Sequence, residues 1–109
     1  MSNFSDYWTA IEETAGRLML AQPTTSAGVA AILAESDPSD PSMRDGRAVA
    51  FWSGANAGRS LDGLLMAAGW RYEWAEASYF WQMRHPESGD VIAYIEGDVY
   101  DTAMPNPDA

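Results

Sequence analysis

A glycine-rich segment with one arginine, GANAGRS at residues 54–60, stands directly before an expected helix. The phosphate-binding loop G-x-x-x-x-G-K-[ST] has four residues between its glycines, so that backbone N–H groups wrap a phosphate, and its lysine reaches the outer oxygens. Here only three residues separate Gly54 from Gly58, and Arg59 takes the place of the lysine. The spacing favours a helix-entry loop capped by Ser60. A small nucleotide-binding enzyme that uses Gly54 to Ser60 remains an alternative.

His85 is the only histidine of the chain and stands directly before Pro86. Acid–base or nucleophilic catalysis needs a histidine that a carboxylate orients beside a nucleophile, and metal binding usually needs two or three such ligands. The chain has no cysteine, so neither thiolate chemistry nor disulfides are available. We expect His85 to be a solvent-facing loop residue, and the sequence predicts no catalytic residue, metal site or cofactor.

Three carboxylates gather in EGDVYD, residues 96–101, after the last expected strand. Their spacing does not match the calcium loop D-x-[DN]-x-[DN]-G with its closing glutamate. Alternate residues of an extended segment share a side, so carboxylates that flank an aromatic ring can meet a basic partner. The segment is a solvated acidic edge, a binding site for Arg or Lys of a partner or, least favoured, a metal site. The predicted partner-binding residues here are Glu96, Asp98, Tyr100 and Asp101.

The charge of the chain is strongly negative and uneven. Sixteen Asp and Glu residues oppose six cations, all of them Arg, and the formal net charge is −10. Residues 1–84 carry ten of the acids and all six Arg, whereas residues 85–109 carry six acids and no Arg or Lys. Nucleic acid and anionic membranes need a cationic footprint, so the expected partner is a basic protein.

Three helices are expected in the first part of the chain. Apolar residues recur at helical spacing over residues 5–21, a shorter helix is expected over 26–35, and a third from Ser60 to Ala68 with Gly69 as its stop. Residues 43–57 are ambiguous. Asp40–Pro41 favours a following helix, whereas Val49 and Phe51 alternate as in a strand. We favour the helix and keep the strand open.

From Trp70 onward the apolar period changes from helical to two, which predicts strands near residues 70–74, 79–84 and 91–96. HPESGD, residues 85–90, reads as the turn of a hairpin between the last two. The sequence therefore predicts an α+β fold with the helices packed on one face of a three-stranded antiparallel meander. The expected organisation is a single domain over 1–103 and a short flexible tail over 104–109.

Six of the thirteen aromatic residues lie in WRYEWAEASYFW, residues 70–81. One aromatic face of the meander must pack under the helices, because a small sheet needs a covered face. Strict alternation puts Trp70, Tyr72 and Trp74 on one face of their strand, and it puts Tyr79 and Trp81 on the face opposite Phe80. If Tyr79 and Trp81 face the core, Phe80 is exposed on the outer face, where Tyr94 and Tyr100 would join it, and which face is exposed stays open. Phe80 and Tyr94 complete the predicted partner-binding residues.

The predicted function follows from the combination of acidity, compact α+β fold and absence of a catalytic motif. We expect a non-enzymatic, cytoplasmic protein-interaction module that acts as an inhibitor or antidote. It would cover a basic, nucleic-acid-facing site of its partner, as immunity proteins and phage inhibitors of host defence do. No apolar run approaches the roughly 20 residues of a membrane span. The alternative from another class is an assembly module of a larger particle, in which the sheet edge pairs with a neighbouring chain.

Overall fold

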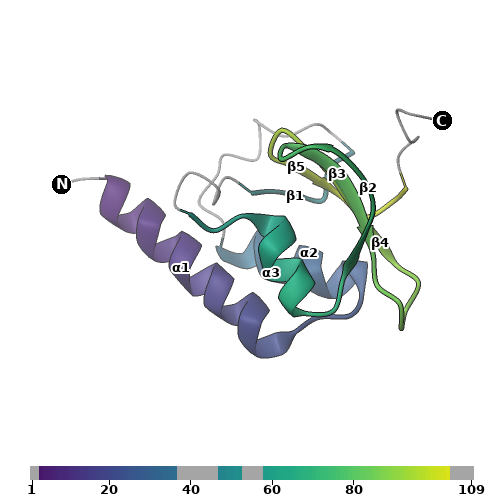
Figure 1. The fold of residues 1–109 in the computed structure, drawn as a ribbon. Coiled ribbons are helices and arrows are strands. Elements are labelled where there is room, and N and C mark those ends of the chain that lie inside the picture. Colours follow the sequence, from purple (N-terminus) through teal and green to yellow (C-terminus); the bar gives the residue numbers. More distant parts are fainter. Residues whose placement is uncertain (1–2, 37–46, 53–57, 104–109) are drawn as a thin grey trace.

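The computed structural model describes residues 3–36, 47–52 and 58–103, which form three helices and a five-stranded antiparallel sheet (Figure 1). The helices are α1 (Asn3–Ala21), α2 (Ser26–Ser36) and α3 (Leu61–Ala67). The strands are β1 (Ala50–Phe51), β2 (Arg71–Ala77), β3 (Phe80–Arg84), β4 (Val91–Ile95) and β5 (Asp98–Tyr100). The three helices lie on one side of the sheet, so the predicted α+β class is confirmed.

The sheet is larger than the predicted meander. Its strand order is β1-β5-β4-β3-β2, so the predicted strands form β2, β3 and β4, and two further strands extend the sheet. Glu96 and Gly97, with φ of 48° and 101°, are the two-residue turn from β4 into β5. Two successive positive φ values suit the twist of a hairpin. The sequence interpretation missed β5 because it took EGDVYD as an acidic cluster that follows the sheet.

The helix favoured over residues 43–57 is wrong at its centre, because Ala50–Phe51 is a strand. β5 supplies the pairing that the sequence alone did not reveal. Backbone N–H groups of Val49 and Trp52 donate to the carbonyls of Val99 and Gly97, each at 2.8 Å. The rest of the ambiguous segment, 43–46 and 53–57, lies outside the described residues, as do the tail residues 104–109.

The helices bury the apolar stripes that their spacing predicts. Ile11, Ala15 and Leu18 of α1 are buried, with Val29 and Leu33 of α2 and Leu61, Leu64 and Leu65 of α3. Against them pack the largest core side chains of the described residues, Trp52, Trp70 and Trp81. The helices and both ends of the sheet therefore share one core.

Gly69 ends α3 as predicted. Its φ of 99° is a left-handed conformation that suits glycine, and its N–H donates to Met66 O at 3.0 Å while the Trp70 N–H donates to Leu65 O at 3.0 Å. This pair of bonds is a Schellman motif, which satisfies the last helix carbonyls. The chain leaves α3 directly into β2, so the helix stop also fixes where the sheet begins.

Within the described residues, no helix combines the length and the apolarity that crossing a membrane requires.

Candidate interaction surface

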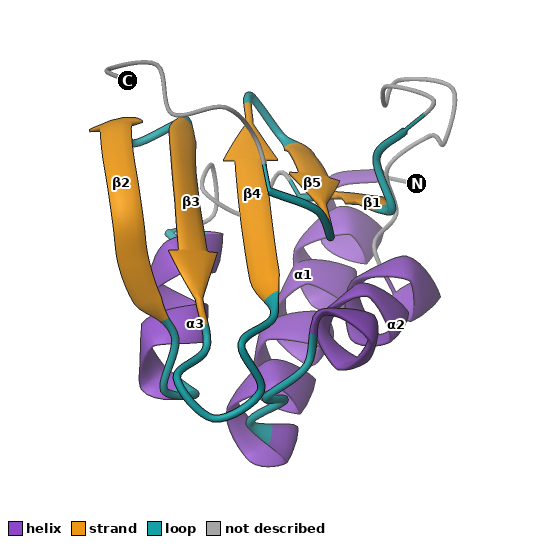
Figure 2. Ribbon diagram, turned by 90° about the vertical axis from the view of Figure 1, so that its right-hand side faces the viewer, coloured by secondary structure: helices purple, strands orange, loops and turns teal. Residues whose placement is uncertain are grey.

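The sheet has an outer face, on the side away from the helices, which Figure 2 views directly. Antiparallel register places a continuous row of side chains across this face. Phe80 of β3 pairs with Ile95, Ile95 with Asp98, and Asp98 with Phe51. Each member of the row is half-buried. Paired residues lie about 5 Å apart, so the row forms a strip of two aromatic rings, one aliphatic chain and one carboxylate.

A β-bulge in β2 adds a further aromatic residue to the outer face. Tyr72 pairs with Met83, but Trp74 pairs with Gln82, so Glu73 is one extra residue in β2. Both bulged residues then project to the same side. Glu73 lies beside the outer-face residues Gln82 and Arg84, since its carboxylate accepts hydrogen bonds from both. The predicted common face of Trp70, Tyr72 and Trp74 is therefore wrong, and Trp74 leaves the core side.

Trp74 and Phe80 meet at a right angle. Their ring centroids are 5.1 Å apart and their planes enclose 83°, an edge-to-face arrangement. Both rings are half-buried, so part of each remains accessible. We call this pair the aromatic corner.

Tyr79 lies next to the aromatic corner and is 55% exposed. The sequence interpretation placed it on the core face, which is wrong, because it stands in the turn that joins β2 to β3. Its carbonyl accepts the N–H of Glu96 at 2.7 Å. That bond fixes the β4–β5 turn beside the β2–β3 turn.

The structure places the predicted partner-binding residues in two different environments. Glu96 and Asp101 are exposed, while Asp98 and Phe80 are half-buried in the row. Glu96, Asp98 and Phe80 lie near the β2–β3 and β4–β5 turns, whereas Asp101 follows the other end of β5. Tyr94 and Tyr100, the other two predicted partner-binding residues, are buried.

Tyr94 is 8% exposed, so the prediction that it lies exposed on the outer face is wrong. It pairs with Trp81 and Val99 and therefore belongs to the core face. Its ring stacks on Trp81 with centroids 5.0 Å apart, and its hydroxyl donates to Trp52 O at 2.8 Å. Tyr94 thus joins β4 to the segment that follows β1.

Tyr100 is on the outer face by register but is only 6% exposed, so its predicted exposure is also wrong. Its register partner is Ala93, which has no exposed surface. The outer face is therefore covered at this pair. Its accessible part lies nearer the β2–β3 and β4–β5 turns.

Glu73, next to the aromatic corner, connects β2 to β3 through side-chain hydrogen bonds on the outer face. It accepts from Gln82 Nε2 and from Arg84 Nε, each at 2.6 Å, and Arg84 also donates to Gly89 O at 2.5 Å. The hydrogen bond from Arg84 lowers the pKa of Glu73, and burial opposes that shift. The Arg84 guanidinium is therefore bound by groups of the same chain, at the end of β3 that is farther from the aromatic corner.

Arg59, the cation of the glycine-rich loop, is also engaged within the protein. Its Nε and Nη2 contact the two carboxylate oxygens of Glu12, each at 2.8 Å, and its carbonyl accepts the Trp52 indole N–H at 2.8 Å. The hydrogen bond from Arg59 lowers the pKa of Glu12. The guanidinium is therefore directed at α1. Residues 54–57 of this loop lie outside the described residues.

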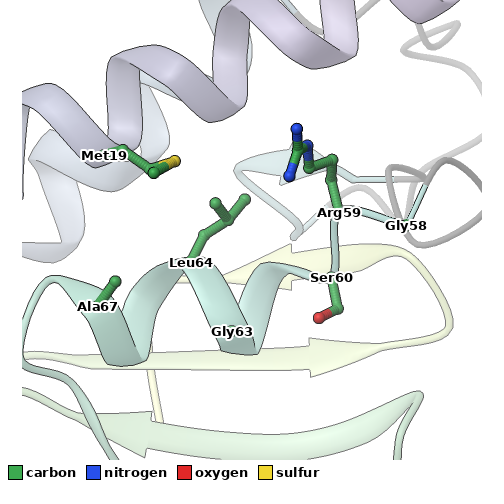
Figure 3. A pocket seen from close by; sticks show the side chains of 7 residues that line it. All are labelled: Met19, Gly58, Arg59, Ser60, Gly63, Leu64 and Ala67. Atoms are coloured by element: carbon green, nitrogen blue, oxygen red, sulfur yellow. The ribbon is translucent and has the colours of Figure 1, made fainter.

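A groove of about 280 Å³ separates α1 from α3, with Arg59 at one end (Figure 3). It is lined by Met19, Gly58, Arg59, Ser60, Gly63, Leu64 and Ala67. Met19 and Leu64 face one another across it. Ser60 stands at the start of α3 as predicted, but its hydroxyl makes no capping hydrogen bond. The groove presents mainly apolar atoms and no second cation among its lining residues.

His85 is buried, at 2% exposure, so the expected solvent-facing position is wrong. Its Nδ1 accepts the Glu87 N–H at 3.1 Å, and its Nε2 lies 3.0 Å from Ala68 O. Because Nδ1 accepts, the ring proton belongs on Nε2, which donates to the carbonyl. The ring packs edge-on against Trp70, with centroids 5.3 Å apart. This histidine joins the 85–90 turn to the end of α3.

In the part of the chain that the structure describes, no three His, Cys, Asp or Glu side chains gather closely enough to hold a metal ion. Comparisons of the chain with family models, curated proteins and solved structures find no match. Any functional inference for this chain therefore has to come from its own surface.

Sequence reasoning missed Trp74 and Tyr79 as outer-surface residues. Trp74 changes face through a bulge, which strict alternation cannot reveal. For β5 a signal was present, because Glu96–Gly97 stands between the apolar run VIAYI and the segment DVY. A residue followed by glycine between two such segments is a hairpin pattern.

Proposed function

We propose that this chain is a non-enzymatic, acidic protein-interaction module that covers a basic, nucleic-acid-facing site of a partner protein. It would act as an inhibitor or antidote, of the kind found among immunity proteins and phage inhibitors of host defence. The observation that carries the proposal is that the exposed Glu96, the half-buried Asp98 and partly exposed aromatic rings lie together at the end of the sheet that holds the β2–β3 and β4–β5 turns. Aromatic anchors with a charged rim are typical of protein interfaces.

The charges of the described residues support a basic partner. Arg17, Arg59 and Arg84 are each paired with a glutamate, at 3.5, 2.8 and 2.6 Å. Glu96 and Asp101, in contrast, are exposed, one before and one after β5. With a net charge of −10, the molecule attracts basic surfaces over long range and repels nucleic acid.

The two alternative functions have less support. Edge pairing in an assembly would use β1, which has only two residues, or β2, whose register shifts between Tyr72 and Trp74 and again between Ala75 and Ala77. Bulges in an edge strand oppose pairing with another chain. For nucleotide binding, the cation of the glycine-rich loop is already paired with Glu12.

Affinity capture followed by competition tests the proposal. The purified chain is cross-linked in a lysate of its source cells at low salt, the captured protein is identified, and its affinity is measured with and without DNA or RNA. We expect a basic partner that the chain and nucleic acid bind in competition. Glu96→Arg with Asp101→Arg should weaken that affinity by about 2 kcal/mol, because charge complementarity at the interface is reversed.

The matched control is Glu13→Arg with Glu87→Arg. It makes the same change in net charge, at exposed positions on α1 and in the 85–90 turn. It should retain most of the affinity. Equal losses in both double variants, or a partner that binds nucleic acid and this chain at the same time, would contradict the proposal.

A further inference from the structure

The aromatic corner has the shape of a cation-binding site. Trp74 and Phe80 stand at 83° to one another with centroids 5.1 Å apart, and both remain partly accessible. A planar cation can lie flat on the face of one ring while the second ring borders it. Aromatic faces attract cations through the ring quadrupole, and arginine is the most frequent partner in proteins.

The backbone of an exposed glutamate is fixed in the turn next to this corner. Ile95 pairs with Phe80, and the following residue, Glu96, donates its N–H to Tyr79 O at 2.7 Å. With φ of 48°, Glu96 occupies the turn itself, and its side chain is exposed. Within the described part of the chain, no ion pair of Glu96 is found. The corner therefore has aromatic walls and an anion beside them.

Three of the arginines in the described part of the chain are bound by glutamates elsewhere. Arg84, on the outer face, is held by Glu73 and by Gly89 O. Arg59 and Arg17 pair with glutamates of the helices. We infer that the aromatic corner, with Glu96, binds an arginine side chain of the basic partner. This inference rests on the proposed function and names the group that the surface recognises.

Arginine fits better than lysine for a geometric reason. A guanidinium is planar, so it can stack on an indole and still direct N–H groups at a carboxylate in its own plane. An ammonium is a compact, strongly hydrated charge that cannot use both walls in this way. The proposed site therefore discriminates between the two basic side chains.

Titration with a hexa-arginine peptide, followed by NMR of the ¹⁵N-labelled chain at low salt, tests the inference. We expect the Trp74 indole N–H signal to move with the Glu96 amide, while those of the fully buried Trp52, Trp70 and Trp81 stay in place. Hexa-lysine should bind more weakly. Hexa-citrulline, which has nearly the same shape without the charge, should not bind.

Variants give the second measurement. Trp74→Leu and Phe80→Leu should each weaken hexa-arginine binding about two- to fivefold, the size of one exposed cation–π contact. Met66→Ala, an exposed apolar residue on α3, is the control and should bind as the original chain does. The NMR titration uses the original chain, so it tests the arginine site even if a variant at Trp74 or Phe80 does not fold.

The inference is overturned if hexa-arginine leaves the Trp74 signal unmoved, or if both corner variants bind it with unchanged affinity. It can fail independently of the proposed function. Suppose that the captured partner loses affinity for the variant with Glu96→Arg and Asp101→Arg but not for Trp74→Leu. The proposed function is then supported, and the proposed arginine site at the aromatic corner is contradicted. If hexa-arginine binds specifically at the corner but the capture yields no basic partner, the arginine site is supported and the proposed function is contradicted.

Discussion

At the scale of single residues, Gly97 is the position where the sheet leaves no room for a side chain. Its φ is 101°, and a Cβ there would lie 2.5 Å from Cε2 and Cζ of the Phe51 ring. Gly89, in the β3–β4 turn, has φ of 78° and nothing within 4 Å of such a Cβ. A side chain at Gly89 would therefore meet only backbone strain, whereas a side chain at Gly97 would meet backbone strain and a clash with the Phe51 ring.

We predict that Gly97→Ala lowers the free energy of unfolding by about 3 kcal/mol, because backbone strain and overpacking add. Gly89→Ala should cost only about 1 kcal/mol, the conformational part alone. Urea denaturation of both variants measures the difference. Adding Phe51→Ala to Gly97→Ala should recover part of the loss, and equal costs for the two glycines would show that Phe51 does not lie against the turn.

The environment of a residue was harder to predict than its role in a turn. Gly69 and Gly89 were placed correctly as a helix stop and a turn glycine, because each role depends on neighbours in the chain. The burial of His85 depends on Ala68 O, which is 17 positions away in the sequence. No local pattern around HPESGD carries that contact. For the same reason Tyr94 and Tyr100 were expected to be exposed.

At the scale of elements, β2 shows where period-two reasoning stops. Alternation predicted the faces of Trp81 and Met83 correctly, since β3 and β4 pair without interruption. In β2 the bulge at Glu73 changes the face of Trp74. The carboxylate that lies in the bulge then holds β2 to β3 through Gln82 and Arg84.

Glu73→Gln should therefore lower the free energy of unfolding at pH 7 by about 1 kcal/mol, the net value of its hydrogen bonds and a partly exposed ion pair. The pKa of Glu73 is lowered in the folded protein. Its contribution is thus complete above its usual pKa and disappears as the pH falls through the lowered one. Denaturant melts from pH 7 to pH 2 should show the two proteins converging in acid.

A second carboxylate provides the control for the loss of one charge. Glu87 is exposed in the 85–90 turn, and Glu87→Gln should leave the free energy of unfolding at pH 7 within about 0.5 kcal/mol of the original chain. A constant difference between Glu73→Gln and the original chain down to pH 2 would mean that the charge of Glu73 does not contribute.

At the scale of the whole molecule, the sequence predicted the class of the fold but not its full extent. Helical and period-two patterns were long enough to define three helices and the central strands. Of the two further strands, β1 was kept open as the less favoured alternative and β5 was missed, and they have two and three residues. Such short elements form because a partner is present, so they cannot be recognised from their own periodicity. The candidate site was found in part, through its acids and Phe80.

The excess of negative charge should make the fold sensitive to salt. Raising NaCl from 20 to 200 mM shortens the Debye length from about 20 to about 7 Å. We predict that the Tm rises by a few degrees, because repulsion within a molecule of net charge −10 is screened. Calorimetry at the two concentrations measures it, with Glu13→Gln and Glu87→Gln together expected to reduce the rise. A Tm that falls with salt would show that the exposed ion pairs dominate instead.

The bulge in β2 also has a consequence for how this strand can change length. A bulge is one inserted residue, so losing the codon for Glu73 would leave Trp74 opposite Gln82, and Ala75 opposite Trp81, as they are now. The same loss in the middle of β3 or β4 would invert the faces of half a strand. A residue can therefore be removed at position 73 while Trp74 stays on the outer face. Glu73 can thus be deleted as a single residue, and the pairing of β2 with β3 on either side of it stays the same.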